Sequence, residues 1–193
     1  GLDRGAAGLR VTENFWKFVG LEQGFTYSAN NLRIGVPGTA ADTIAFGNRI
    51  YQWNLNPVFH LTPRGSKVRP YLTAGVSAMN FNPTDTAEGF ARIAENAALY
   101  HAQGLSDNLQ MAMNFGGGVK WHLTDHFGLR FDLRSTLSRN PSYGLPDSKA
   151  SGGAYIPRGD KLAGLIPTVG LNWYFGKKYV PPPPAAPAPP QAL

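Results

Sequence analysis

Histidines, carboxylates and basic side chains are the groups of this chain that could do chemistry. The 193 residues include four histidines, 12 acidic and 18 basic residues, and no cysteine. Without cysteine there is no thiol nucleophile, no disulfide and no cysteine-ligated metal. His122 and His126 are four apart, but they end an alternating segment, where this spacing does not bring side chains together. Since no segment gathers His, Ser and Asp, the sequence predicts no enzyme, metal or cofactor site.

Seven charged residues stand at alternate positions, opposite apolar neighbours. If they share one interior, burial requires that they be paired and hydrogen-bonded. One interpretation is a structural network in which Glu22 and Asp132 each hold several cations; the other is a cation-lined constriction that passes small anions. The inward set is Arg10, Glu22, Arg69, Lys120, Arg130, Asp132 and Arg134.

The elements that carry these charges have a period of two. From Phe127 to Ser138, apolar residues alternate with polar residues or glycine. This pattern predicts a strand with one apolar and one polar face. Seven such segments occur, at about residues 7–13, 17–33, 43–62, 68–80, 108–123, 127–138 and 161–175.

The connections between these segments alternate between short and long. Turns near residues 14–16, 63–67 and 124–126 are short, whereas segments 34–42, 81–107 and 139–160 are long and hold seven of the 12 acidic residues. Short turns at one end and long loops at the other are typical of outer-membrane β-barrels. The interior of a small barrel is just wide enough to be filled by side chains, which fits a network of inward charges.

A soluble sandwich or lipocalin-like barrel is the alternative, and there the apolar face points inward. Two features favour the membrane interpretation. Glycines such as Gly116 and Gly118 suit a crowded interior, and large aromatic residues stand near the strand ends of the apolar face. These aromatic residues are Phe59, Trp53, Trp121, Phe127, Trp173 and Phe175.

The final strand carries Thr168, Gly170, Trp173 and Phe175, a pattern similar to the terminal assembly signal of bacterial outer-membrane barrels. With 114–123, 127–132 and 174–178, the chain resembles the small OmpA-like barrel domains over about residues 7–178. The resemblance implies an all-β, transmembrane, up-and-down antiparallel barrel of about eight strands. It also implies contact with outer-membrane lipid and with the barrel assembly machinery of a Gram-negative cell, with extracellular long loops. Because seven strands are visible, we expect the first strand to precede Gly1.

The long segment 81–107 contains a candidate helix. Asp85 can cap it, Glu88 takes the third position and Gly104 can end it. Its apolar stripe either packs on the barrel rim or binds an extracellular partner. The stripe consists of Phe90, Ile93, Ala94 and Ala97.

The C-terminal segment is rich in proline, since Pro181–Pro190 holds seven of the 16 prolines. Such a stretch predicts an extended polyproline spacer. We therefore expect a barrel over 1–178 and a periplasmic tail over 179–193.

The predicted function is that of a structural anchor, which tethers the outer membrane to a periplasmic, cell-wall or cell-surface partner. The alternatives are an anion-leaning, porin-like channel and a subunit of a larger outer-membrane assembly. Nucleic acid is not an expected partner, because the basic residues form no single stripe interleaved with aromatic residues.

Overall fold

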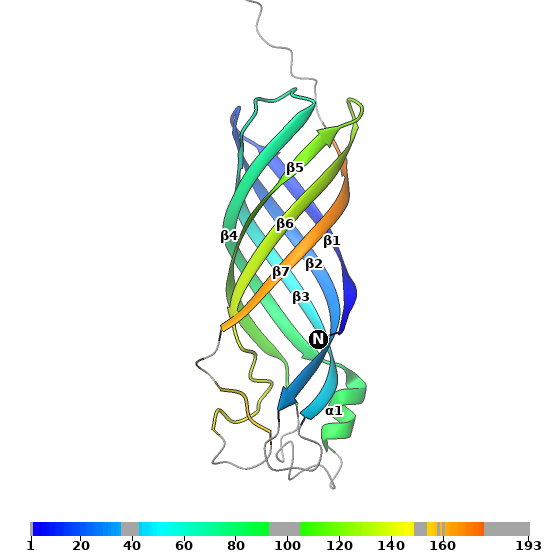
Figure 1. Cartoon of the computed structure of the whole chain (residues 1–193), viewed down its shortest axis with the longest axis vertical. Coiled ribbons are helices and arrows are strands. Elements are labelled where there is room, and N and C mark those ends of the chain that lie inside the picture. The colour runs from blue at the N-terminus through cyan, green and yellow to red at the C-terminus, as the bar shows by residue number, and fades with distance from the viewer. Residues whose placement is uncertain are drawn as a thin grey trace, which may run out of the picture.

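The computed structural model describes residues 2–35, 43–92, 105–148, 154–157, 159 and 161–175. These residues form an all-β fold, a single sheet of seven antiparallel strands in sequence order that curls into a barrel-like shape (Figure 1). The predicted seven strands are confirmed. Their bounds are β1 (Leu2–Asn14), β2 (Val19–Gly35), β3 (Thr43–His60), β4 (Val68–Pro83), β5 (Asn108–His122), β6 (Phe127–Arg139) and β7 (Lys161–Trp173).

Two strands are longer than the alternation predicts. β1 begins at Leu2, because its first residues pair with β2 across an irregularity between Asp3 and Ala6. Gly5 lies there with a φ of 94°. The glycine and alanine residues offer no contrast between apolar and polar faces, so the period of two is hidden. β4 continues to Pro83, which pairs with Asn48 of β3.

The two ends of the sheet differ in their connections. Turns 15–18, 61–67 and 123–126 lie at one end, here called the short-turn end. The described residues 84–92, 105–107 and 140–148 lie at the other, the long-loop end (Figure 1). Within the described residues, β1 and β7 are the two edges of the sheet, and neither has a second strand neighbour.

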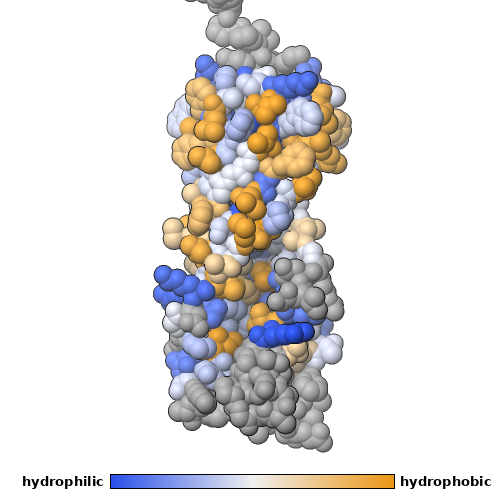
Figure 2. All heavy atoms as spheres, viewed as in Figure 1, coloured by the Kyte–Doolittle hydropathy of each residue, from blue (hydrophilic) through white to orange (hydrophobic). Residues whose placement is uncertain are grey.

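The polar face of the sheet is the inner face. Glu22 of β2 is 1% exposed, whereas Leu171 of β7 is 80% and Leu109 of β5 is 71% exposed. Arg10 of β1 reaches across the interior to Asp132 of β6. Apolar side chains therefore gather on the outside of the strands, with hydrophilic residues toward both ends (Figure 2). A soluble barrel has the opposite arrangement.

Exposed aromatic side chains lie at two levels on the outer face. One level is at the short-turn end, where Phe127 packs against Trp173 with ring centroids 4.4 Å apart. The other joins Phe25 to Trp53 at 5.1 Å and Tyr27 to Tyr51 at 5.4 Å. Trp53 therefore lies within β3 and not near its end, because the strand continues to Thr43 beyond it.

An apolar cluster fills the interior at the long-loop end, which the sequence did not predict. Phe46 and Phe81, from the inner faces of β3 and β4, pack edge-on against the fully buried Tyr143. Tyr143 has a φ of 51° and precedes Gly144 at 81°, a turn that directs its ring inward. Burial raises the pKa of its hydroxyl. Ala87, Ala91, Leu105, Leu145, Ala154 and Ile156 complete this loop-end core with Met79 and Ala112.

The first part of the predicted helix forms as α1 (Asp85–Arg92), but its cap differs from the prediction, and the predicted end at Gly104 lies outside the described residues. The hydroxyl of Thr84 accepts a hydrogen bond from the backbone N–H of Ala87 at 3.4 Å. Thr84 is therefore the capping residue, and the prediction of Asp85 was wrong by one position. Asp85 instead forms an ion pair with Arg49 of β3, with 3.6 Å between Oδ2 of the aspartate and Nη2 of the arginine. No described helix is long and apolar enough to cross a membrane.

Candidate functional site: a buried charge network

Glu22 is the first of two carboxylates that organise the interior. One of its oxygens accepts a hydrogen bond from Nη1 of Arg130 at 2.7 Å, and the other accepts one from Nη2 of Arg134 at 2.5 Å. Thr12 of β1 adds its hydroxyl at 3.1 Å. The carboxylate of β2 is thus bound to two arginines of β6 and to the neighbouring strand.

Asp132 is the second carboxylate, and its side chain is fully buried. Nη1 of Arg10 donates to both of its oxygens at 2.9 Å. Nε of Arg134 lies at 2.9 Å and Nε of Arg130 at 3.2 Å. Arg130 and Arg134 therefore each bridge the two carboxylates. We call these five residues (Arg10, Glu22, Arg130, Asp132, Arg134) the salt-bridge network.

Gly118 and Tyr71 make room for this network and extend it. A Cβ atom on Gly118 would lie 2.6 Å from Cβ of Asp132 and 2.8 Å from the hydroxyl of Tyr71. Glycine is therefore needed at this position of β5 so that the two strands and the tyrosine can approach closely. The Tyr71 hydroxyl accepts a hydrogen bond from Nε of Arg130 at 2.9 Å, and its ring lies 5.0 Å from the guanidinium.

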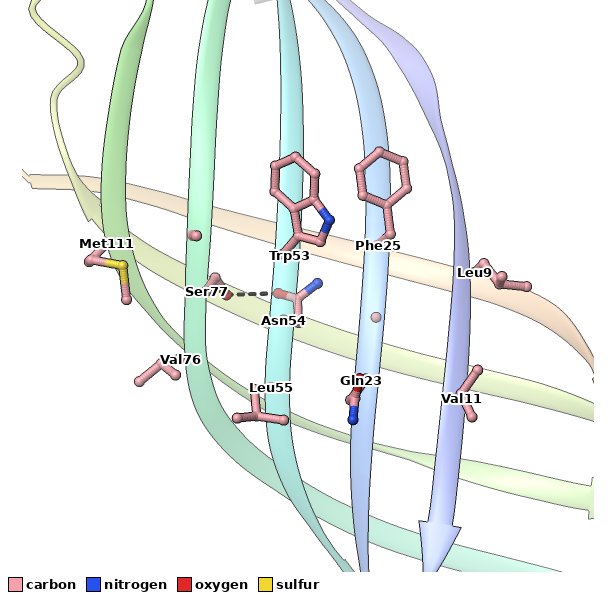
Figure 3. A pocket seen from close by; sticks show the side chains of 12 residues that line it. Leu9, Val11, Gln23, Phe25, Trp53, Asn54, Leu55, Val76, Ser77 and Met111 are labelled. Atoms are coloured by element: carbon pink, nitrogen blue, oxygen red, sulfur yellow. Dashed lines mark hydrogen bonds between the residues drawn. The ribbon is translucent and has the colours of Figure 1, made fainter.

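A neutral polar layer lies beside the network on the inner faces of β3, β4 and β5. The side-chain amide of Asn114 donates to Ser77 at 2.6 Å, and Asn56 donates to Asn114. Ser77 in turn donates to Asn54 at 2.7 Å (Figure 3). The sequence placed these residues on the polar face by their parity, but it did not indicate that they bind one another.

Arg69 and Lys120 were predicted to belong with the other inward charges, but the structure leaves them outside the salt-bridge network. Arg69 of β4 stands opposite Lys120 of β5, and Lys120 stands opposite Arg130 of β6. Among the described residues, Nζ of Lys120 reaches the hydroxyl of Thr12, at 3.4 Å, and the ring of Tyr71, at 5.3 Å from its centroid. Nε and Nη2 of Arg69 have no hydrogen-bond partner among the described residues.

The other predicted residues take no part in the salt-bridge network. Thr168 and Gly170 face inward on β7, while Trp173 faces outward and stacks on Phe175 with centroids 6.0 Å apart. This geometry does not test their role as an assembly signal. Phe90 belongs to α1, and the rest of its predicted stripe (Ile93, Ala94, Ala97) lies outside the described residues, as does Pro181–Pro190.

The network offers little to a substrate or a metal. All four oxygens of Glu22 and Asp132 accept hydrogen bonds from arginine. The acceptor sites of both carboxylates are therefore already used within the network. In the part of the chain that the structure describes, no three His, Asp or Glu side chains could hold a metal ion. The arrangement is suited to closing and stabilising the interior.

Comparison with known proteins found no matching family model, no matching curated protein and no matching solved structure.

Proposed function

We propose that this chain is an integral β-barrel protein of a bacterial outer membrane, with a structural, anchoring role and no catalytic one. The observation that carries the proposal is the direction of the two faces. Charged and amide side chains point into the curled sheet, and large apolar side chains point out along the strands. An apolar surface of this extent is unfavourable in water and favourable in lipid.

The outer surface has further features that suit lipid. Phe59 and Tyr51 of β3, which belong to the two aromatic levels, are about 26 Å apart along an extended strand. A strand tilt of about 40° reduces this to about 20 Å along the barrel axis, close to the apolar band of known membrane barrels. A hollow of about 470 Å³, lined by side chains such as Leu9, Phe25 and Met111, opens on this face and could hold part of an acyl chain (Figure 3).

The filled interior favours an anchor over a channel. The salt-bridge network joins β1 and β2 to β6, and the loop-end core occupies the interior at the long-loop end. The resemblance to OmpA-like barrel domains supports the tethering role, in which Pro181–Pro190 would lead to a periplasmic or cell-wall partner. Both the family and the tether remain proposals.

The second candidate function is that of a subunit in a larger assembly, and the free edges of the sheet favour it. The described edges β1 and β7 have one strand neighbour each, so both expose backbone hydrogen-bonding groups. In lipid these groups must be satisfied. An eighth strand, from this protein or from another chain, would satisfy them.

Because the chain has no cysteine, single-cysteine variants can test the lipid contact directly. Leu133→Cys places a spin label on the outer face of β6, and Ser106→Cys places one on an exposed long-loop segment. In vesicles, we expect the label at 133 to be relaxed by oxygen and the label at 106 by a water-soluble nickel complex. Equal accessibility of both labels to nickel would contradict membrane insertion.

Planar-bilayer recording can distinguish the anchoring function from the channel alternative. The proposal predicts no steady conductance for the folded wild-type chain, whereas the channel alternative predicts an anion-selective current. Folding is first verified by the change in gel migration on boiling, which is expected of a membrane barrel, so that a silent recording cannot come from unfolded protein.

A further inference from the structure

The inward charges are unbalanced. Five of the seven are cationic and two are carboxylates, and the carboxylates are fully used by Arg10, Arg130 and Arg134. Arg69 and Lys120 therefore add positive charge to the short-turn half of the interior, and within the described ranges neither forms an ion pair. Like charges directly opposite one another in a sheet are destabilising, so this arrangement calls for a counter-charge.

Arg69 is the most conspicuous unpaired group. It is 5% exposed, and two of its nitrogens, Nε and Nη2, are buried without a hydrogen-bond partner. Lys120 stands opposite it in the next strand, and the guanidinium of Arg64 adds positive charge nearby. Nε and Nη2 of Arg64 also lack partners. A buried guanidinium without an acceptor is costly, because it has lost its hydration without replacement.

Further unused donors lie around the same residues. His60 is 3% exposed, packs 6.1 Å from the ring of Tyr71 and lies near the backbone of Phe18, and neither ring nitrogen has a hydrogen-bond partner of ordinary geometry among the described residues. Nη2 of Arg130, the nitrogen that the salt-bridge network does not use, is also without a partner. Guanidinium, ammonium and imidazole groups thus line one region, and each has capacity to donate.

One position on the inner face of β7 is open. Gly170 faces inward opposite Arg130, and a Cβ atom at that position would meet nothing within 4 Å. The loop-end core occupies the other end of the interior. A small ligand bound by the cationic groups would therefore have to enter from the short-turn end.

We propose that Arg69, Lys120 and His60 form a binding site for a phosphate-class oxyanion in the short-turn half of the barrel interior. The planar guanidinium matches two oxygens of such an anion, and the ammonium supplies a second positive charge. The anion could be free phosphate or the phosphate of a lipid headgroup, since the chemistry is shared. The site goes beyond the anchoring role and does not require an open channel.

The test measures the thermal unfolding of the folded 193-residue chain in a non-ionic maltoside detergent. Inorganic phosphate is titrated at constant ionic strength against chloride. We expect phosphate to raise the unfolding temperature of the wild type and of Arg139→Gln, an exposed control at the opposite end of β6. Arg69→Gln should bind phosphate at least about tenfold more weakly, as expected when one charge-assisted hydrogen bond is lost. A second arm replaces phosphate by phosphatidylglycerol, and an effect seen only there would identify the headgroup as the source.

The phosphate-free samples provide a second readout that separates a ligand site from a structural arginine. Arg69→Gln should then unfold at the same temperature as the wild type or higher, because repulsion with Lys120 is removed. Lys120→Gln should show the same loss of phosphate response. The proposal is overturned if neither phosphate nor phosphatidylglycerol stabilises the wild type, if Arg69→Gln responds as strongly as Arg139→Gln, or if Arg69→Gln fails to fold.

Discussion

Single residues decide whether the buried charges stabilise or destabilise this interior. Glu22 and Asp132 are both required, because each binds Arg130 and Arg134, and no other carboxylate among the described residues pairs with these two arginines. A buried ion pair contributes little beyond an apolar pair of the same volume, but removal of one partner leaves a charge that cannot be hydrated.

Replacing Glu22 by glutamine should therefore be strongly destabilising. The variant keeps the shape of the side chain but leaves Arg130 and Arg134 with one carboxylate between them. We expect a loss of about 3–5 kcal/mol in the free energy of unfolding, measured by urea titration of the folded protein in detergent. Glu13→Gln, at an exposed position of β1, is the matched control and should change the value by less than about 0.5 kcal/mol. Equal effects for the two variants would mean that the network does not stabilise the fold.

At the level of the elements, close approach between strands positions the network. Gly118 of β5 stands directly opposite Asp132 of β6. A side chain at 118 would meet the backbone oxygen of Phe131 as well as the aspartate. The absence of a side chain at Gly118 is therefore necessary for Asp132 to take its position in the salt-bridge network.

Gly118→Ala tests this packing. The added methyl group should force β5 and β6 apart and lower the free energy of unfolding by about 1–3 kcal/mol. Gly89→Ala in α1 is the control, because a Cβ atom there meets nothing within 4 Å and alanine favours a helix by about 0.5–1 kcal/mol. Urea unfolding monitored by tryptophan fluorescence compares the two, and a neutral Gly118→Ala would show that the interior has spare room at this point.

For the whole molecule, the environment of the outer face determines how a charge is tolerated there. Leu133 lies at the middle of β6, and Leu123 lies in the turn at the short-turn end. Both side chains are about half exposed, at 48% and 52%. In water the two positions would behave alike, whereas in a membrane only the first would be deep in hydrocarbon.

Leu133→Arg should thus cost about 2–4 kcal/mol when the protein is folded in vesicles, and Leu123→Arg about 0–1 kcal/mol. Reversible denaturant titration in lipid vesicles measures both values. If the two variants are equally stable, the proposal that lipid covers the middle of the outer face would be contradicted.

The period of two in the sequence is sufficient to predict much of this structure. Alternation of apolar and polar residues is local, so it located all seven strands and assigned the two faces. It also placed Glu22 and Asp132 on the same face as the arginines. Side-chain parity within a strand follows from backbone geometry alone, and for this reason these features needed no tertiary information.

Partners and cores depended on the tertiary structure, because they join residues far apart in the chain. Arg10 and Asp132 meet only when the sheet curls, and no spacing in the sequence indicates that Arg69 is left without a carboxylate. The loop-end core around Tyr143 was missed because its residues come from separate strand ends, from α1 and from irregular segments, which no single period connects. The sequence prediction chose Asp85 as the helix cap, whereas the structure uses Thr84, because both adjacent residues have side chains that can cap a helix. The sequence thus determined which face each charge occupies, and the curl of the sheet decided which charges are paired.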